Sequence, residues 1–575
     1  MRHNSTRLKV FASVLPFIAF LLPVYVAFRK SFQLDEFVYA HWGWLSSQGQ
    51  RIGVDFFVTH FPLIACLTSL PFRVVGSAPT AIFYDRLLMI PFFALTCLAA
   101  FAINSRISLT TGVLSPVFLC LNSVLIVHIT EIRPDSLAIA LYLAASAILL
   151  WPKKIRIPIS FCGGMLLVLA VLSSEKTLVY GPAIFVALGF GFHGSSAEER
   201  TEIKRHLGIA ASGAAATVSG VILYLLHGRA LHFWASVWWP YATLHERSYP
   251  ASRWAGLRLL RTLCTYEPVL ILLAAWAVIK IAGNIKGNRD RSLSTNPAQV
   301  FLVALLATSI VSILIQKAPM PYSVIPVAAA TSMLAAAGLT YIWEDIKARQ
   351  QGRSRSFLIA GTTVALLLFV ATNVWAQFKI ASRGNSGQMQ TLQLLAKIST
   401  PSECVYDNSG GAIARPHADD RFYQTDLPTR IVQADILQQE IPAAIQNRGC
   451  ALMLQDGRTL TLPEPLQEFL AENYFSYTDD ISVWGKSFVS QEDFLHSESF
   501  SAVATGKYFV WPSMVNKQLE IAIDGTELKS QTFGLTKGDH TVEFRGRGAF
   551  YILWLPKNTQ PFEPQKAIQP RLLEM

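Results

Sequence analysis

Two adjacent carboxylates, Asp35 and Glu36, follow the first long apolar stretch of the chain by a few residues. Carboxylates are costly to desolvate beside a membrane, so this position calls for a physical reason. One carboxylate could act as a general base on a hydroxyl group while the other orients a donor or a cation. The dipole of a helix N-terminus also favours acidic residues and would explain the pair structurally. From the pair alone, both interpretations stay open.

Further polar side chains recur near the ends of later apolar stretches, at places that the topology below assigns to the same side of a membrane. The cations among them could hold a phosphate or pyrophosphate group through charge-assisted hydrogen bonds. For the lysines, the alternative is an interfacial anchor whose charged end reaches water. Seven residues are therefore candidate substrate contacts: His60, Arg86, Glu131, Arg133, Asp135, Lys176 and Lys317.

The elements that must position these residues are membrane spans. Of the 575 residues, 52% are hydrophobic and only 15% are charged, which is too little charge to cover a soluble protein of this size. Residues 1–376 are predicted to form the membrane domain, and within them Pro62–Phe72 is too short to span and is expected to be an interfacial helix. About eleven spans are predicted, near residues 10–28, 79–103, 109–128, 136–151, 158–173, 177–193, 207–226, 267–283, 299–315, 321–342 and 356–376.

The basic residues predict how these spans are oriented. They gather in every second connection, as the positive-inside rule requires of cytoplasmic loops, which places the N-terminus in the cytoplasm. Topology then explains the net charge of +11, and no nucleic-acid partner is expected. An odd number of spans places the candidate residues and the chain from residue 377 onward on the outer side. The basic clusters are Arg106, Lys153–Arg156, Arg200–Arg205, Lys286–Arg291 and Lys347–Arg355.

The C-terminal third lacks such apolar blocks and is predicted to fold outside the membrane as two units. Short apolar runs alternate with the helix-like Glu464–Tyr474, which indicates a small α/β unit within residues 377–490. Beyond it, apolar residues alternate on both sides of turn signals such as Asp524-Gly525, which indicates a β-sandwich within residues 491–575.

Cysteine and histidine usage gives little support for a metal site. Only Cys404 and Cys450 of the seven cysteines fall in the polar C-terminal region, where they could pair if that side is oxidising, although spacing alone does not establish the bond. The histidines are scattered and form no strong ligand spacing with cysteine or with one another. No cofactor is predicted, and a divalent cation held by the carboxylates stays an open alternative.

The order of the polar motifs resembles the GT-C superfamily of membrane glycosyltransferases. The matching features are a first span, the external segment Asp35–Ala40, the His-x-Pro of residues 60–62, and the Arg-Pro-Asp of residues 133–135. More narrowly, the chain is similar to the branch of protein O-mannosyltransferases, lipid A aminoarabinose transferases and rhizobial galacturonosyltransferases. The resemblance covers residues 10–376 in layout, and its specific motifs are short. The external loops and the tail depart from the aminoarabinose branch, which leaves the sugar and the acceptor open.

The resemblance implies an inverting transfer from a polyprenyl-phosphate sugar to a lipid, cell-envelope polysaccharide or protein acceptor. The transfer would take place in a cavity between the spans and the external loops of an inner (plasma) membrane protein. Asp35 would then be the base with Glu36 beside it. Arg133 and Asp135 would help to shape the cavity, and Lys317 would contact the donor phosphate.

The same chemistry is coherent without the resemblance. A polyprenyl phosphate is a good leaving group that the bilayer delivers, so the absence of a phosphate-binding glycine loop is no obstacle, and the protein must supply a base, cations and a dry cavity. The main alternative is a transporter or flippase of lipid-linked sugars, although transporters usually place ionisable groups at the bilayer midplane. A third hypothesis is a membrane-anchored binding protein, but eleven spans are excessive for an anchor.

Overall fold

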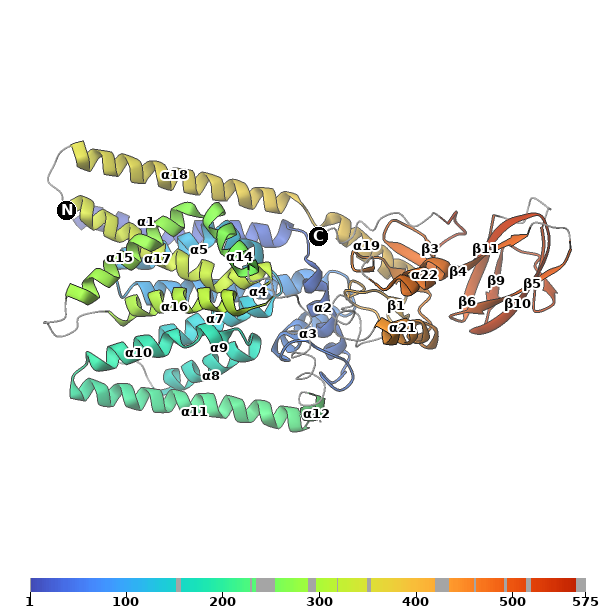
Figure 1. The fold of residues 1–575 in the computed structure, drawn as a ribbon, viewed down its shortest axis with the longest axis horizontal. Coiled ribbons are helices and arrows are strands. Elements are labelled where there is room, and N and C mark those ends of the chain that lie inside the picture. The colour runs from blue at the N-terminus through green and yellow to red at the C-terminus, as the bar shows by residue number, and fades with distance from the viewer. Residues whose placement is uncertain are drawn as a thin grey trace.

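The long axis of the molecule runs from a bundle of helices, past a layer of shorter helices, to a strand-rich C-terminal region (Figure 1). The N-terminus lies at the end of the bundle that is farthest from the strands (Figure 1). Parts of three predicted cytoplasmic loops, residues 151–156, 288–295 and 349–352, lie outside the described residues. The computed structural model describes residues 2–150, 157–227, 230–233, 254–287, 296–317, 319–348, 353–418, 434–459, 462–490, 494–512 and 519–564.

In the described part of the chain, five helical segments are long and apolar enough to cross a membrane. At 1.5 Å per residue, even the 19 residues of the shortest extend about 28 Å, close to the thickness of a hydrocarbon core. Helices satisfy their own backbone polar groups, as a lipid environment requires. These segments contain α4 (Ala81–Asn104), α11 (Ala197–His227), α16 (Pro297–Ile315), α17 (Ile325–Ala348) after the short helix η3 (Pro321–Val324), and α18 (Arg353–Ser382).

Three further pairs of apolar helices are bent at a short break, and counting each pair as one span gives up to eight among the described residues. The breaks have local causes. The Asn122 side chain accepts a hydrogen bond from the amide of Leu125 and so caps the helix that follows it. Pro268, which has no amide hydrogen, is the first residue of α15. The pairs are α1 (Arg2–Arg29) with α2 (Leu34–Ser47), bent by 79°, α5 (Leu109–Leu121) with α6 (Ser123–Ile129), bent by 71°, and α14 (Ala255–Tyr266) with α15 (Pro268–Gly287), bent by 101°.

Shorter helices complete the bundle and its outer layer. Each predicted span coincides with an apolar helix or a bent pair, so the chain is a polytopic helical membrane protein, as predicted. The predicted interfacial segment forms α3, which lies beside α2 between the bundle and the C-terminal region (Figure 1). These helices are α3 (Leu63–Val75), α7 (Pro134–Leu149), α8 (Ile157–Ser173), α9 (Thr177–Tyr180), α10 (Ala183–His193) and α12 (Leu231–Phe233).

Helix α17 is the centre of the bundle, and its small residues allow close packing. Nearly all of its apolar window is buried. A Cβ atom added at Gly338 would lie 1.9 Å from the carbonyl oxygen of Leu273 in α15, so only glycine permits this approach. Small residues that bring helix backbones together are typical of packing in membranes. Lipid tails are as apolar as the helix surfaces, so helices associate there through close van der Waals packing and not through the hydrophobic effect.

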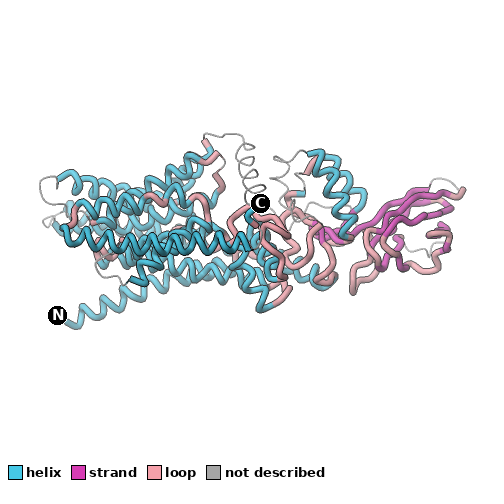
Figure 2. Tube along the Cα trace, turned by 90° about the horizontal axis from the view of Figure 1, so that it is seen from below, coloured by secondary structure: helices cyan, strands magenta, loops and turns pink. Residues whose placement is uncertain are grey.

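The C-terminal region is built on a continuous sheet, and Figure 2 shows the strands gathered at one end of the molecule. Strand β4 pairs with β2 and β3 along its first half and with β11 along its second half, so it belongs to the α/β unit and to the sandwich alike. The sheet order is β1-β2-β4-β11-β6-β9, with β1 and β2 parallel. The strands are β1 (Val405–Tyr406), β2 (Leu452–Leu454), β3 (Tyr474–Ser476), β4 (Ile481–Ser490), β6 (Gly506–Trp511), β9 (Thr532–Leu535) and β11 (Gly548–Trp554).

A second sheet of order β5-β10-β7-β8 completes the sandwich. Alternate residues such as Ile521, Ile523, Val542 and Phe544 point into its core, as their spacing predicts. Cys404 and Cys450 form the disulfide that the sequence left open. The remaining elements are β5 (His496–Ala502), β7 (Leu519–Ile523), β8 (Thr526–Glu527), β10 (Gly538–Gly546), α19 (Ser386–Ile398), α21 (Ala434–Arg448) and α22 (Glu464–Asn473).

Candidate active site

Glu36 ties the start of α2 to the bundle. It is fully buried, and its carboxylate accepts hydrogen bonds from Arg86 Nε at 2.7 Å, from Arg86 Nη2, from the amide of Ile132 at 3.1 Å and from the amide of Gln33 at 2.9 Å. A carboxylate has about four lone-pair sites, so these donors fill it. The remaining donors of Arg86 go to the backbone carbonyls of Ala27, Lys30 and Ser31.

Asp35, the preceding residue, meets different partners. Its Oδ2 lies 2.8 Å from Nη1 of Arg133, its Oδ1 lies 3.6 Å from Nη2 of Arg458, and 27% of its side chain is exposed. Burial alone would raise the pKa of Asp35, but the charges of Arg133 and Arg458 outweigh it and hold the pKa below its ordinary value. Asp35 is therefore an ionised carboxylate at neutral pH, and its partly exposed side chain is within reach of a ligand.

The connection between α6 and α7 supplies the arginine that pairs with Asp35. Glu131 is fully buried and forms ion pairs with Lys30 and with Nε of Arg133. Burial raises the pKa of Glu131, yet the two cations more than reverse this and lower it well below the usual range. Because Glu131 holds one edge of the Arg133 guanidinium, the opposite edge is directed at Asp35.

A second cation, Lys176 at the N-cap of α9, contacts the start of α7. Lys176 Nζ is 3.1 Å from Oδ1 of Asp135, which also accepts a hydrogen bond from the Ser174 hydroxyl at 3.1 Å. The ring of Tyr322, from η3, receives both cations, with the Arg133 guanidinium 4.1 Å and the Lys176 ammonium 4.6 Å from its centroid. Tyr322 thus holds two cations together where an anionic group could bind.

The other two predicted contacts lie around this network. His60 packs beside aromatic rings of α2, with centroids 5.9 Å from Tyr39 and 6.5 Å from Trp42. Lys317 is exposed on the connection between α16 and η3, five residues before Tyr322. The structure therefore brings together Asp35, Glu36, Arg86, Glu131, Arg133, Asp135 and Lys176, and it places His60 and Lys317 on neighbouring elements.

Three members of the site were not predicted from the sequence. Lys30 follows the first span and could have been noticed as a cation at its outer end. Tyr322 begins a predicted span, where an aromatic ring is usually an interfacial anchor. Arg458 lies in the C-terminal α/β unit, and no local pattern links it to Asp35.

The carboxylates of the site have basic partners. Among the described residues, no group of three or more His, Cys, Asp or Glu side chains is arranged to hold a metal ion. Asp35, Glu36, Glu131 and Asp135 each contact an arginine or a lysine instead.

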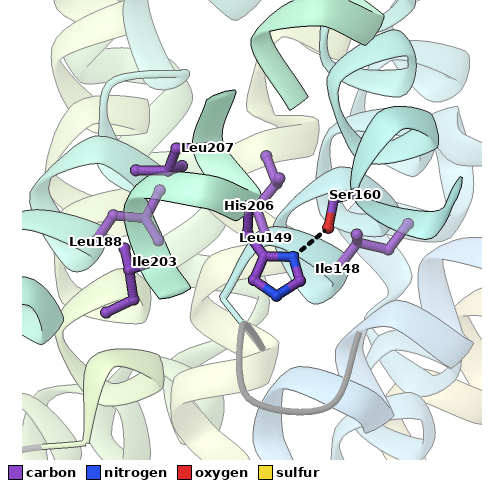
Figure 3. A pocket seen from close by; sticks show the side chains of 7 residues that line it. All are labelled: Ile148, Leu149, Ser160, Leu188, Ile203, His206 and Leu207. Carbon is purple, nitrogen blue, oxygen red and sulfur yellow. Dashed lines mark hydrogen bonds between the residues drawn. The ribbon is translucent and has the colours of Figure 1, made fainter. Parts of the chain in front are cut away.

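A separate pocket lies at the other end of α7 (Figure 3). Asp135 is in the first turn of α7 and Leu149 is in the last, so the two are about 20 Å apart along the helix. The only hydrogen bond drawn in the pocket joins Ser160 Oγ to His206 Nδ1 at 2.8 Å (Figure 3). The described residues that line it are otherwise aliphatic: Ile148, Leu149, Leu188, Ile203 and Leu207.

Comparison by sequence finds no match, either to a protein-family model or to a curated protein. Comparison by structure does. The crystal structure of ArnT from Cupriavidus metallidurans bound to undecaprenyl phosphate superposes with a TM-score of 0.55 at 14% identity, over 83% of this chain and 98% of that one.

Two archaeal structures are similar as well. The apo oligosaccharyltransferase of Archaeoglobus fulgidus matches with a TM-score of 0.53 at 10% identity, over 81% of this chain and 73% of that one. The oligosaccharyltransferase AglB of the same organism, in complex with an inhibitory peptide and a dolichol-phosphate, matches with a TM-score of 0.50 at 11% identity, over 82% and 73% of the two chains. At such identities a likeness establishes the fold, and here it is the GT-C fold that the motif order predicted.

Proposed function

We propose that this chain, which has the GT-C fold, is a membrane glycosyltransferase that moves a sugar from a polyprenyl-phosphate donor to an acceptor on the outer side of the membrane. Its main support is the ionised, partly exposed Asp35, which lies beside Arg133 and near a second cation, Lys176. The solved ArnT and AglB structures hold undecaprenyl phosphate and dolichol-phosphate, so donors of this class fit on the same architecture.

The reaction requires one base and one stabilised leaving group. Asp35 takes the proton of an acceptor hydroxyl while the hydroxyl oxygen forms a bond to the anomeric carbon of the sugar. The bond between that carbon and the phosphate oxygen breaks, and the electron pair leaves with the polyprenyl phosphate, which gains one negative charge. A single displacement of this kind inverts the anomeric configuration.

Lys176 and Arg133 are suited to the developing charge on the phosphate. Both contact the Tyr322 ring, and Lys176 is 19% exposed while its partner Asp135 is largely buried. Charge-assisted hydrogen bonds to phosphate are stronger than neutral ones, and they gain further strength where water is excluded. Glu36 and Arg86 do not contact the substrates in this proposal; their ion pair holds α2, the helix that carries Asp35, against the bundle.

The donor sugar in this proposal is a hexosyl or pentosyl unit, and the acceptor is a lipid, a cell-envelope polysaccharide or a protein. The protein would be a multi-pass component of the inner (plasma) membrane, with its N-terminus in the cytoplasm and its C-terminal region outside. The charged network lies at the end of the bundle that adjoins the C-terminal region, so donor and acceptor would meet between the two (Figure 1).

The experiment that tests the proposal measures transfer from a panel of radiolabelled polyprenyl-phosphate sugars into acceptors of native membranes. Wild type is compared with Asp35→Asn, which keeps the shape of the side chain and removes its charge. A matched control is Asp55→Asn, because Asp55 forms an exposed ion pair with Arg51 in the same outer segment of the chain, at 2.9 Å.

We expect one donor to label membranes that contain wild type or the Asp55 variant and to fail with the Asp35 variant. That result would also name the sugar. If wild type uses no donor of the panel, the transferase proposal is wrong, and transport of lipid-linked sugars becomes the better explanation of the outer site. If the Asp35 variant labels as well as wild type, Asp35 is not the base.

A further inference from the structure

Helix α2 is shared between the bundle and the C-terminal α/β unit. The loop after β1 packs directly on it: a Cβ atom added at Gly410 would lie 3.2 Å from Cβ of His41 and 3.3 Å from Cα of Val38. Gly410 also has a φ of +69°, so both its conformation and its surroundings favour glycine. His41 Nδ1 lies 3.3 Å from the carbonyl oxygen of Ile413, which adds a polar contact to the same interface.

The edge of the α/β unit that meets α2 is the one where such folds bind ligands. Strands β1 and β2 are parallel, and the loops that follow them carry Asp407 and Asp456. In open α/β sheets, ligands bind outside the carboxyl ends of parallel strands. Here the loop beyond that end contacts α2, the helix that carries Asp35 in its first turn, so this edge of the α/β unit and the candidate active site coincide.

These two loops are stiffened by buried carboxylates. Asp407 accepts hydrogen bonds from four consecutive backbone amides, those of residues 409–412. Asp456 accepts hydrogen bonds from the amides of Arg458 at 2.8 Å and Thr459 at 3.2 Å, and from the Ser409 hydroxyl. Both carboxylates are buried. A fully satisfied buried polar network rigidifies its surroundings, so Arg458 is presented from a fixed turn.

Arg458 and Arg133 approach Asp35 from different parts of the molecule. Arg133 follows the α6 helix of the bundle and takes Oδ2, whereas Arg458 comes from the α/β unit and lies nearest Oδ1. The Arg458 side chain is only 12% exposed, so the contact is a component of the interface and not a surface ion pair. Two guanidinium groups, one on each oxygen, restrict how the carboxylate can rotate.

We propose that Arg458 is a positioning residue for Asp35, and that the active site is complete only when the C-terminal α/β unit is docked on α2. This inference rests on the proposed function and adds to it that an extramembrane domain supplies part of the reaction centre. The hydrogen bond from Arg133 fixes Oδ2, and the charge of Arg458, 3.6 Å from Oδ1, favours the orientation of the carboxylate in which Oδ1 faces the α/β unit. Arg458 also keeps the carboxylate ionised in a largely buried place.

The test uses the full-length protein in membranes with whichever radiolabelled polyprenyl-phosphate sugar of the panel wild type transfers, and compares Arg458→Ala and Arg458→Lys with wild type. The control is Arg547→Ala, an exposed arginine at the far sandwich. The pH dependence of kcat is measured for each variant. The charged or titratable groups that face Asp35 are Arg133, Glu131, Tyr39, Tyr322 and Arg458, so only one of them changes.

For Arg458→Ala we expect kcat to fall about tenfold or more, because misplacing a reacting group is costly, while the donor KM changes little. The acid limb of the profile should move to higher pH by roughly half to one unit, because Asp35 loses one of two positive neighbours. Arg458→Lys should restore the position of that limb, and Arg547→Ala should match wild type. An Arg458→Ala protein with the kcat and acid limb of wild type would overturn the inference.

A second measurement separates the failure of this inference from the failure of the proposed function. Thermal unfolding in detergent is compared for Asp35→Asn, Arg458→Ala and the double variant. If wild type transfers no sugar, the proposed function has failed, and the melting cycle still decides whether the two residues act together. Effects that do not add would support the pair. Effects that add would show that Arg458 does not act through Asp35.

Discussion

The two ends of helix α7 bury very different polar groups. At the N-terminal end, Asp135 belongs to a network of carboxylates and cations that extends to Asp35 and Glu36. At the C-terminal end, the pocket of Figure 3 is aliphatic except for the hydrogen bond between Ser160 and His206. Helices of the same bundle frame both places, so the difference between them lies in the side chains.

The contrast indicates which end is built for chemistry. Removing an ion from water costs several kcal/mol even after relaxation, and buried ion pairs are often no more stable than the apolar residues that could replace them. Stability alone therefore does not account for Glu36, Arg86, Glu131 and Arg133 near the N-terminal end of α7. The hydrogen bond between Ser160 and His206 involves no carboxylate, so its burial costs less free energy and is explained by packing alone.

The largest effect should come from removing the charge of Asp35. Asp35→Asn is expected to lower kcat by about 10²-fold to 10⁴-fold, the usual contribution of a general base, and to lower the melting temperature modestly, because Arg133 loses one of its two carboxylate partners and keeps Glu131. Initial rates and thermal melts of the same preparation measure both. A rate within a few-fold of wild type would remove the contrast between the two ends.

Replacing Glu36 should damage the fold before it affects the chemistry. Glu36→Gln leaves the buried Arg86 without its counter-charge, which is expected to lower stability by about 3–5 kcal/mol. Thermal unfolding in detergent measures the loss. If Glu36→Gln melts like wild type but has lost transfer, Glu36 takes part in the reaction directly, and the structural role given to it above is wrong.

Lys176 should have a smaller effect that is confined to the donor. For Lys176→Met we expect kcat/KM for the donor to fall at least about tenfold, because one charge-assisted hydrogen bond to phosphate is worth about 1.5–3 kcal/mol and strengthens as charge develops on the leaving group. Titration of the polyprenyl-phosphate donor at fixed acceptor concentration measures this change. If Lys176 is only an interfacial anchor, Lys176→Met should have the same kcat/KM for the donor as wild type.

The smallest effect should follow a change at the C-terminal end of α7. His206→Ala removes the hydrogen bond to Ser160, which is worth about 1 kcal/mol of stability, and should leave transfer within about twofold of wild type. The assay is the same donor transfer measurement. A large loss of transfer with intact folding would mean that both ends of α7 serve the reaction, which is contrary to the comparison drawn here.

The neighbouring carboxylates show where prediction from the sequence stopped. Their place just outside the first span could be predicted, since span length and charge bias are properties of short stretches of chain. The distinct surroundings of Asp35 and Glu36 could not, because consecutive residues of a helix point in directions about 100° apart and what each meets depends on other helices. Glu36 met Arg86, and Asp35 met Arg133 and the α/β unit.

The sequence by itself determined the membrane class, the places of the apolar helices, the division into a helical part and a strand-rich C-terminal part, and the position of Asp35 and Glu36 just beyond the first apolar helix, because the bilayer imposes its thickness on local composition. Only the tertiary structure decided that Tyr322 gathers Arg133 and Lys176, and that Arg458 reaches Asp35 from the far part of the chain. Such contacts arise from the docking of distant elements, and no periodicity in the sequence records which surfaces will meet.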